Sequence, residues 1–372
     1  MHFVPQSRNT EERTGMHQPG GLRWTVGLAG SGPVSCVEPP ARMPRARALE
    51  LLRGSDNPSA YMALNQATSH FTVAGTDGFI AYRRHGGFLF QLGGGFGAPA
   101  ARRTLLAAFR QFAQERACRI CAVQLQEEDV ALYREQGFCI NQMGTAYTIE
   151  LDAFCAAGSH FTRLRNKVSQ ARRAGIAVVE LGVDAPRGSL EWGELFSISH
   201  AWLAAKRENT KLVEFMVGEL GQPRDLERRV FAARQDGKII GFISFVPVQG
   251  ARPGLLHDLT RRRADAPPGV MDLINMTAIA RFQQEGVRHL HFGLSPFAGL
   301  NPQRDRVAGK SWLLTQIAKG IYRHGACIYP ARQQEQYKRK WHPHVALPEY
   351  VGFEGGFSLV GLWRLMQLTR TV

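Results

Sequence analysis

The sequence predicts a mixed α/β protein whose chain runs twice through the same order of elements. Two stretches are typical of a β-hairpin that turns at Asp-Gly, "HFTVAGTDGFIAYRR" at 70–84 and "RRVFAARQDGKIIGFISFVPV" at 228–248. After each hairpin, apolar runs and helical periodicities follow in the order strand, helix, strand, helix, strand. Hairpins give antiparallel strands and crossover helices give parallel ones, so each half is predicted to contain a mixed sheet.

The individual elements follow from local patterns. A short helix near "ARALELLRG" (46–54) is the first ordered element, because its apolar residues share one face. In the first half we then expect, after the hairpin, a strand at 87–94, a helix at about 102–115, a strand at 119–126, a helix at 128–136 and a strand at 140–151. In the second half we expect a strand at 254–260, a helix at 269–285, a strand at 288–294, a helix at about 309–322 and a strand "ACIYP" at 326–330.

A basic amphipathic helix is predicted between the two halves. In "SHFTRLRNKVSQARRAGIAVVEL", the apolar residues fall at helical spacing, and Gly175 stands where a C-terminal cap belongs. Five cations cover much of the remaining surface: Arg163, Arg165, Lys167, Arg172 and Arg173. Two interpretations stay open, a solvated face of an interdomain helix or a surface that contacts phosphates.

These patterns predict five regions along the chain. The N-terminal stretch is rich in Gly, Pro, Arg and Ser and has no periodicity, so it is expected to be an irregular tail. The predicted regions are the tail at 1–45, a first domain at 46–157, the basic connecting helix at 158–176, a second domain at 177–350 and a C-terminal amphipathic helix at 351–372. The last helix either docks on the domain or lies at a membrane interface.

Composition narrows the class of protein. The 372 residues carry a net charge of +15, which favours a polyanionic partner such as tRNA or an anionic lipid surface. No run approaches the length of about 20 apolar residues that a membrane-spanning helix needs, and the N-terminus lacks the apolar stretch of a signal peptide, so we expect a cytoplasmic location. Cys118 and Cys121 form the single C-x-x-C, with no second pair to complete a zinc site, so no metal is expected.

The glycine run "QLGGGFGAP" matches the dinucleotide fingerprint G-x-G-x-x-A through Gly93, Gly95 and Ala98. That fingerprint belongs to the first strand of a parallel βαβ unit, whereas here a hairpin precedes it. A strand end at which backbones pass closely is the better interpretation. The repeated element order suggests the Gcn5-related N-acyltransferase (GNAT) fold, but neither half has the glycine loop that usually holds coenzyme A pyrophosphate.

From about residue 55 onward, the chain resembles the C-terminal catalytic domain of bacterial aminoacyl-phosphatidylglycerol synthases, also called multiple peptide resistance factors, and its soluble relatives. The motifs that carry the resemblance are the basic helix, "AWLAAKREN…FMVGEL", "HDLTRRRADAPPGVMDLI", "HFGLSPFAGL", "IYRHG" and "YKRKWHP", in that order. Several motifs in one order are more specific than any one of them. The acid that often follows the Arg-His-Gly segment of the family is replaced by Ala326 here.

The resemblance implies two GNAT-like halves joined by a basic helix, with aminoacyl-tRNA as co-substrate and no further cofactor. Asp258 and Arg261 fall on the catalytic Asp-x-x-Arg of the family, and Lys338 and Lys340 fall on its Lys-x-Lys. The structural alternative is an ion pair between Asp258 and Arg261 at the end of a strand. Candidate substrate-binding residues are Asp272, Trp202 and Lys206.

The chemistry of these residue types fits the implied reaction. Asp258 can take or orient the proton of the attacking group, and Arg261 can pair with a phosphate. Lys338 and Lys340 can neutralise phosphates or the developing oxyanion. Asp272 lies in the first turn of a predicted helix, where it either suits the helix dipole or binds an ammonium group.

The expected function is the transfer of an aminoacyl group from tRNA to a hydroxyl or amine acceptor, either a phosphatidylglycerol-type lipid or a small metabolite. A peripheral contact with the inner face of the membrane goes with the lipid acceptor. Two alternatives remain: a non-catalytic protein that binds tRNA or another polyanion, and an acyl-CoA-dependent N-acyltransferase. The sequence leaves the transferred amino acid and the oligomeric state undetermined.

Overall fold

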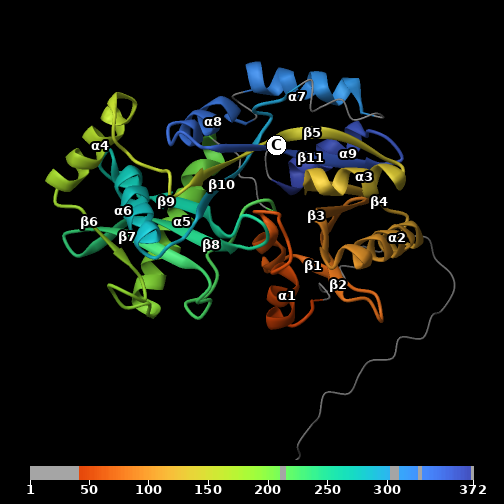
Figure 1. Cartoon of the computed structure of the whole chain (residues 1–372), viewed down its shortest axis with the longest axis horizontal. Coiled ribbons are helices and arrows are strands. Elements are labelled where there is room, and N and C mark those ends of the chain that lie inside the picture. The colour runs from red at the N-terminus through yellow and green to blue at the C-terminus, as the bar shows by residue number, and fades with distance from the viewer. Residues whose placement is uncertain (1–41, 210–214, 302–309, 326–328, 370–372) are drawn as a thin grey trace, which may run out of the picture. The chain divides into compact units, whose positions relative to one another are not determined.

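The computed structural model describes residues 42–209, 215–301, 310–325 and 329–369, with the side chains of 206–209 excepted. All of them belong to one compact unit of the chain, Pro40–Val372 (Figure 1). The predicted tail at 1–45 lies almost wholly outside the described residues, and the predicted strand "ACIYP" overlaps the undescribed residues 326–328.

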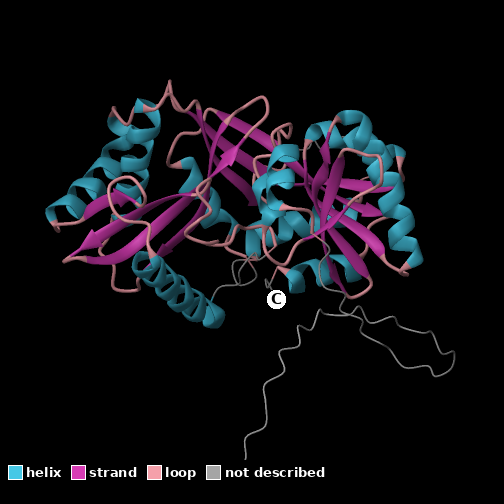
Figure 2. Cartoon of the chain, turned by 90° about the horizontal axis from the view of Figure 1, so that it is seen from below, coloured by secondary structure: helices cyan, strands magenta, loops and turns pink. Residues whose placement is uncertain are grey.

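Within the described residues the strands form one mixed sheet of eleven strands, with helices on both faces (Figure 2). Their order across the sheet is β1-β2-β3-β4-β11-β5-β10-β9-β8-β7-β6. Two neighbouring pairs, β3 with β4 and β9 with β10, are parallel, and the other pairs are antiparallel. The predicted mixed α/β class is therefore confirmed. The strands are β1 Ser69–Phe71, β2 Gly78–His85, β3 Phe88–Gly97, β4 Arg119–Leu125, β5 Phe138–Glu150, β6 Ala177–Glu180, β7 Arg229–Gln235, β8 Lys238–Val248, β9 Gly254–Arg262, β10 His289–Pro296 and β11 Val345–Glu354.

The helices connect and cover these strands. In the described parts of the chain they are α1 Arg45–Leu52, α2 Pro99–Glu115, α3 Glu127–Glu135, α4 Thr162–Arg173, α5 Ser189–Asn209, α6 Val270–Gln284, α7 Trp312–His324, α8 Ala331–Arg339 and α9 Leu359–Leu368, with short 3-10 helices at Ala60–Leu64 and Ser159–Phe161. In the first half, α2 and α3 pack on one face of the sheet, and α1 and α9 pack on the other. In the second half, α4 and α6 cover one face and α5 covers the other.

The two predicted hairpins turn differently. In the second, Asp236 and Gly237 both have positive φ (50° and 77°), as the predicted Asp-Gly turn requires. In the first, the positive φ belongs to Gly75, and Gly78 is already the first residue of β2, paired with Gly97. The Asp-Gly turn was therefore wrong for the first hairpin, because the chain reverses earlier, at Gly75.

The last strand lies in the middle of the sheet. Strand β11 pairs with β4 on one side and with β5 on the other, both antiparallel. Strand β5, from the first half of the sequence, pairs in turn with β10 from the second half. The predicted boundary at residue 350 falls inside β11, and the C-terminal helix begins at Leu359 rather than at 351. The correction has a physical cause: an apolar run next to a helix cannot reveal by itself that it pairs with distant strands.

Helix α4 is amphipathic as its pattern predicts. Leu164, Val168 and Ala171 are buried, and the helix packs against α6. Gly175 has φ +74° just beyond the last turn, so the predicted cap is confirmed.

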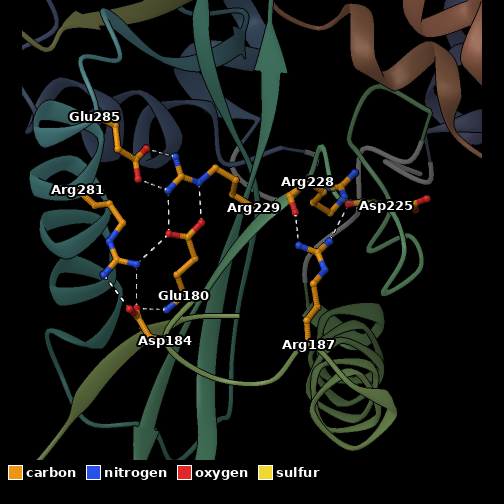
Figure 3. Close-up of polar contacts among 8 residues, drawn as sticks. All are labelled: Glu180, Asp184, Arg187, Asp225, Arg228, Arg229, Arg281 and Glu285. Carbon is orange, nitrogen blue, oxygen red and sulfur yellow. Dashed lines mark hydrogen bonds and ion pairs between the residues drawn. The ribbon is translucent and has the colours of Figure 1, made fainter. Parts of the chain in front are cut away.

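A network of ion pairs links β6, β7 and α6 (Figure 3). Glu180 is buried and accepts two hydrogen bonds from Arg229, at 2.6 and 2.8 Å, and one from Arg281 at 3.1 Å. Arg229 also reaches Glu285, and Arg281 also donates twice to Asp184 at 2.9 Å. Burial lowers the pKa of Arg229, but its bonds to Glu180 and Glu285 outweigh that effect and raise it. Each arginine of this network therefore stays charged and has carboxylate partners.

Candidate active site

A cavity of about 950 Å³ opens beside the ends of β9 and β10. Its walls come from both halves of the sequence, with Arg83 and Gln124 from the first and with residues of α5, β9 and α8 from the second. The volume lies within the range of sites that hold drug-sized ligands. Four of the predicted site residues line it: Trp202, Asp258, Arg261 and Lys338.

Asp258 is a buried carboxylate with fixed partners. It forms an ion pair with Arg228, which is buried as well, and it accepts a hydrogen bond from the backbone N–H of Gly218 at 2.9 Å. A Cβ at residue 218 would lie 2.0 Å from a carboxylate oxygen of Asp258, so only glycine fits there. The backbone carbonyl of Arg228 is itself held by Arg187 at 2.7 Å (Figure 3). The ion-pair partner of Asp258 is therefore Arg228, and the predicted structural alternative, a pair with Arg261, was wrong.

Arg261 is buried in the cavity wall without a carboxylate partner among the described residues. Its guanidinium carbon lies 4.0 Å from the centre of the Trp202 ring, and Nη1 donates to the carbonyl of Thr260 at 3.0 Å. Its buried Nε has no hydrogen-bond partner in the described part of the chain. Burial lowers the pKa of Arg261 to about 10, although Asp258 acts in the opposite direction. A cation that is charged, desolvated and incompletely paired is suited to binding an anion.

Lys338 is the second buried cation of the cavity. Its Nζ donates to the carbonyls of Gly293 and Leu294, at 2.9 and 2.6 Å, on strand β10. The strand has a register shift between His291 and Gly293, and Gly293 has φ +64°. Burial lowers the pKa of Lys338 to about 7, with Glu349 opposing the shift. At neutral pH this amine is therefore divided between its neutral and charged forms.

Two further titratable groups lie close to Lys338. Glu349, on β11, is fully buried, and burial raises its pKa to about 7 against the effect of Lys338 and two glutamines. His257, on β9, lines the cavity, and burial together with the charge of Lys338 lowers its pKa to about 3. His257 is therefore neutral at pH 7. Lys338 and Glu349, whose pKa values burial has moved to about 7, mark a candidate catalytic site.

Lys340 and Asp272 bind each other instead of facing the cavity. The Nζ of Lys340 forms an ion pair with the carboxylate of Asp272 and lies 4.1 Å from the centre of the Tyr337 ring. Neither residue lines the cavity. Burial lowers the pKa of Lys340, although Asp272 opposes the shift. Each of these two charges therefore has the other as a partner, and the contacts of Lys340 with a phosphate and of Asp272 with an ammonium group stay predictions.

The remaining predicted residues lie elsewhere. The five cations of α4 are all exposed and none of them lines the cavity: Arg163, Arg165, Lys167, Arg172 and Arg173. Arg165 donates to the carbonyls of Ala156 and Gly158, at 2.9 and 2.8 Å. Lys206 belongs to α5, but its side chain lies outside the described residues, as does the whole of Ala326.

Several residues of the site escape sequence reasoning. Arg228 and Glu349 stand in stretches whose local pattern indicates only strand or loop, and His257 opens the "HDLT" motif of the resemblance but was not singled out. A signal existed for Gly218, since the resemblance includes the Phe-x-x-Gly in which it stands. Within the described residues, no group of three or more His, Cys, Asp or Glu side chains is arranged to hold a metal ion. In the same residues, none of the helices has the length and apolar character to cross a membrane.

The fold and the cavity define a mixed α/β protein with a cationic site, and comparison with known proteins identifies its family. Residues 47–353 match the family described as "Phosphatidylglycerol lysyltransferase, C-terminal", so the chain belongs to that family. The chain is 25% identical over 256 residues to the phosphatidylglycerol lysyltransferase of Bacillus subtilis, which covers 66% of this chain and 28% of that protein. It is 24% identical over 263 residues to the lysylphosphatidylglycerol biosynthesis bifunctional protein LysX of Rhodococcus opacus, covering 70% of this chain and 23% of the other.

These matches span less than a third of the length of the two relatives. Solved structures agree on the fold. L-PGS from Bacillus licheniformis is 19% identical, with a TM-score of 0.69, and the match covers 90% of this chain and 99% of that one. The C-terminal domain of a proposed lysylphosphatidylglycerol synthetase from Agrobacterium fabrum is 21% identical, with a TM-score of 0.68, covering 87% and 94%.

Proposed function

We propose that the chain is an aminoacyl-tRNA-dependent aminoacyltransferase that moves an aminoacyl group to a hydroxyl or amine acceptor. The acceptor is a phosphatidylglycerol-type lipid or a small metabolite, and the family supports the lipid. One observation carries the proposal: Lys338 and Arg261 line a deep cavity and have no carboxylate within ion-pair distance among the described residues. Aminoacyl-tRNA is a co-substrate in this reaction, and no further cofactor enters it.

Lys338 acts as the base in the proposed mechanism. Two of the four positions around Nζ are directed at the carbonyls of Gly293 and Leu294 and a third is its bond to carbon, so the neutral amine has one lone pair left. Nζ takes the proton of the acceptor hydroxyl as its oxygen attacks the ester carbonyl carbon. The bond to the ribose oxygen then breaks, and that oxygen receives the proton from Nζ. A base with a pKa near neutrality suits both transfers.

Arg261 and Asp258 have separate roles. Arg261 stabilises the negative charge, either of the carbonyl oxygen in the transition state or of a phosphate of the substrate. Its stacking on Trp202 fixes the plane of the guanidinium. Asp258 is engaged by Arg228 and by the N–H of Gly218, so it acts as a positioning residue for β9 rather than as the base.

The proposal assigns the tRNA contact to α4. Its five exposed cations form a surface without any acidic residue on the helix, and phosphate contacts of this kind bind nucleic acid without reading sequence. The proposed tandem GNAT-like organisation fits the same arrangement, because hairpin, strand, helix, strand and helix occur in this order in both halves, with α4 between them.

A transfer assay tests the function. Total tRNA charged with labelled amino acids is incubated with the protein, phosphatidylglycerol vesicles and a metabolite extract. Label in the lipid phase identifies a lipid acceptor, and label in a new water-soluble product identifies a metabolite. If the ester decays at its spontaneous rate in every mixture while tRNA binds tightly and in a salt-dependent way, the chain is a non-catalytic polyanion-binding protein instead.

Lys338→Met provides the matched inactive enzyme, and Lys238→Met provides the control, because Lys238 is exposed at the start of β8. Product formed by the parent and by Lys238→Met, but not by Lys338→Met, assigns the activity to this cavity. Equal product from all three proteins removes Lys338 from the mechanism. Calorimetry with coenzyme A addresses the remaining alternative, since an acyl-CoA transferase binds it and the proposed enzyme does not.

A further inference from the structure

Helices α7 and α9 each begin with exposed apolar side chains. Trp312 and Leu313 open α7 and are 71% and 43% exposed. Leu359 and Val360 open α9 with exposures of 58% and 62%, and Trp363, one turn later, is 50% exposed. Large apolar side chains that gather on a surface mark an interaction site. These five residues are called the α7–α9 edge below.

The two helix starts lie next to each other. The thiol of Cys139 on β5 lies near the backbones of both Ser311 and Phe357, which stand just before α7 and α9. An apolar pocket also separates the two helices, with Leu314 and Ala318 on one wall and Leu365 on the other. The exposed side chains therefore stand at the starts of two helices that line the same pocket.

The exposed side chains of the α7–α9 edge form a surface that a partner can contact. The pocket between the two helices has a volume of about 60 Å³ and an apolar lining. The apolar area of the α7–α9 edge is on the outside, and tryptophans at helix surfaces are typical of a membrane–water interface.

Charge identifies the kind of partner. The stretches 310–325 and 357–369 contain no Asp or Glu. They carry Lys310, Lys319, Arg323 and Arg364, and the chain as a whole has a charge of +15. A second copy of the chain would bring the same positive charge against the edge, which disfavours self-association. A bilayer surface that contains anionic lipid offers both the opposite charge and an apolar layer for the tryptophans.

We propose that the α7–α9 edge docks the protein on an anionic lipid bilayer. This inference rests on the proposed function in one respect: the purpose of docking is to bring a lipid acceptor to the cavity. Three residues support this placement, because Met216, Pro296 and Tyr329 line both the apolar pocket under the edge and the candidate active site. When the protein lies on the bilayer through this edge, a single wall of side chains separates the apolar pocket under the edge from the cavity.

Co-sedimentation with vesicles tests the docking. Parent protein is expected to bind vesicles of equal phosphatidylglycerol and phosphatidylcholine, and W312S/W363S is expected to bind them at least about fivefold more weakly. The variant keeps every charge, so a loss of binding cannot come from electrostatics. The control L190S/L226S removes two leucines that are 84% and 76% exposed outside the edge, and it is expected to bind as the parent does. Equal binding by W312S/W363S and the parent overturns the inference.

A second measurement separates this inference from the proposed function. Transfer is compared between phosphatidylglycerol in vesicles and water-soluble glycerophosphoglycerol at equal headgroup concentration. W312S/W363S is expected to lose at least about fivefold with vesicles and to match the parent with the soluble acceptor. An equal loss with both acceptors contradicts docking as the cause. If the parent transfers to neither acceptor, the lipid function fails, and the sedimentation result alone decides whether the edge docks.

Discussion

Cations occur in two different settings in the second half of the molecule. Arg229 and Arg281 join β6, β7 and α6, and both meet the carboxylate of Glu180 (Figure 3). Arg261 and Lys338 line the cavity, where backbone carbonyls and a tryptophan ring are their partners. The pKa of each arginine in the network is raised, and the pKa of both cavity cations is lowered.

The contrast separates stability from function. A cation that is fully paired with carboxylates holds strands and helices together and has no capacity left for a ligand. A desolvated cation without such a partner costs stability, and a substrate anion or a proton transfer can use it. The following experiments test this division from the largest expected effect to the smallest.

Lys338→Met is expected to lower the transfer rate by about a hundredfold to ten-thousandfold, because the base is lost. It is also expected to stabilise the protein at low pH. The folded-state pKa is about 7 and the ordinary value is 10.5, so the penalty of burying the charge is full below pH 7 and is relieved as the pH rises toward 10.5. Denaturant unfolding at pH 6 and pH 9 measures the gain, which should be smaller at pH 9. A variant that is less stable at both pH values would contradict the assignment.

Arg228→Met is expected to destabilise the protein by about 3–5 kcal/mol, because it leaves the buried Asp258 carboxylate without its ion-pair partner. Arg261→Met is expected to change the free energy of unfolding by only about 1 kcal/mol, since no carboxylate depends on Arg261, but to lose transfer. Urea unfolding of both variants, with transfer measured under native conditions, gives the comparison. Similar destabilisation by the two substitutions would show that Arg261 is structural.

Glu180→Gln is expected to cost about 2 kcal/mol, because charged hydrogen bonds to Arg229 and Arg281 become neutral ones. Transfer at a temperature well below the unfolding midpoint should equal that of the parent. The free energy of unfolding and the kcat for transfer, measured on the same preparation, check both statements. A fall in kcat without loss of stability would connect the network to the reaction.

The pH dependence of transfer should follow the protonation of Lys338. Its neutral form is the active one, so the rate is expected to fall about tenfold per pH unit below pH 7 and to level off above it. A kcat profile between pH 5.5 and 8.5 shows this directly. A profile that falls as the pH rises through 7 would assign the activity to the charged amine.

The smallest effect is expected on α4. Arg172→Ser with Arg173→Ser should weaken tRNA binding a few-fold and lower the slope of log affinity against log salt by about 1.5, because two phosphate contacts are lost. Neither side chain is buried, so stability should be unchanged. Filter binding at several salt concentrations measures the slope. Arg103→Ser is the control, an exposed arginine of the first half that is paired with Glu135.

The sequence located one part of the site and missed another for a physical reason. Asp258 and Arg261 stand three residues apart on one strand, so a local motif finds both. The partner of Asp258 comes from 30 residues away, and that of Lys340 from 68 residues away. A choice between distant partners depends on the completed sheet and leaves no periodicity along the chain. For this reason the contact between Lys340 and Asp272 was not predicted from the sequence.

The fold, like the site, has parts that local sequence patterns predict and parts that they do not. The type and approximate bounds of α2, α4 and α6 follow from apolar spacing, and for α4 and α6 also from a glycine just beyond the last turn, which are local properties. The place of β11 between β4 and β5 does not, because strand pairing is decided by contacts between segments more than 190 residues apart.

The position of β11 also bears on how the protein is made. A ribosome delivers β4 and β5 long before residues 345–354 leave the exit tunnel. Until then the two strands have no β11 between them, and their unpaired backbone groups are open to other chains. The sheet therefore closes from the inside, and it does so only after β11 has been synthesised. Stalling or truncation before residue 345 should therefore leave an aggregation-prone product.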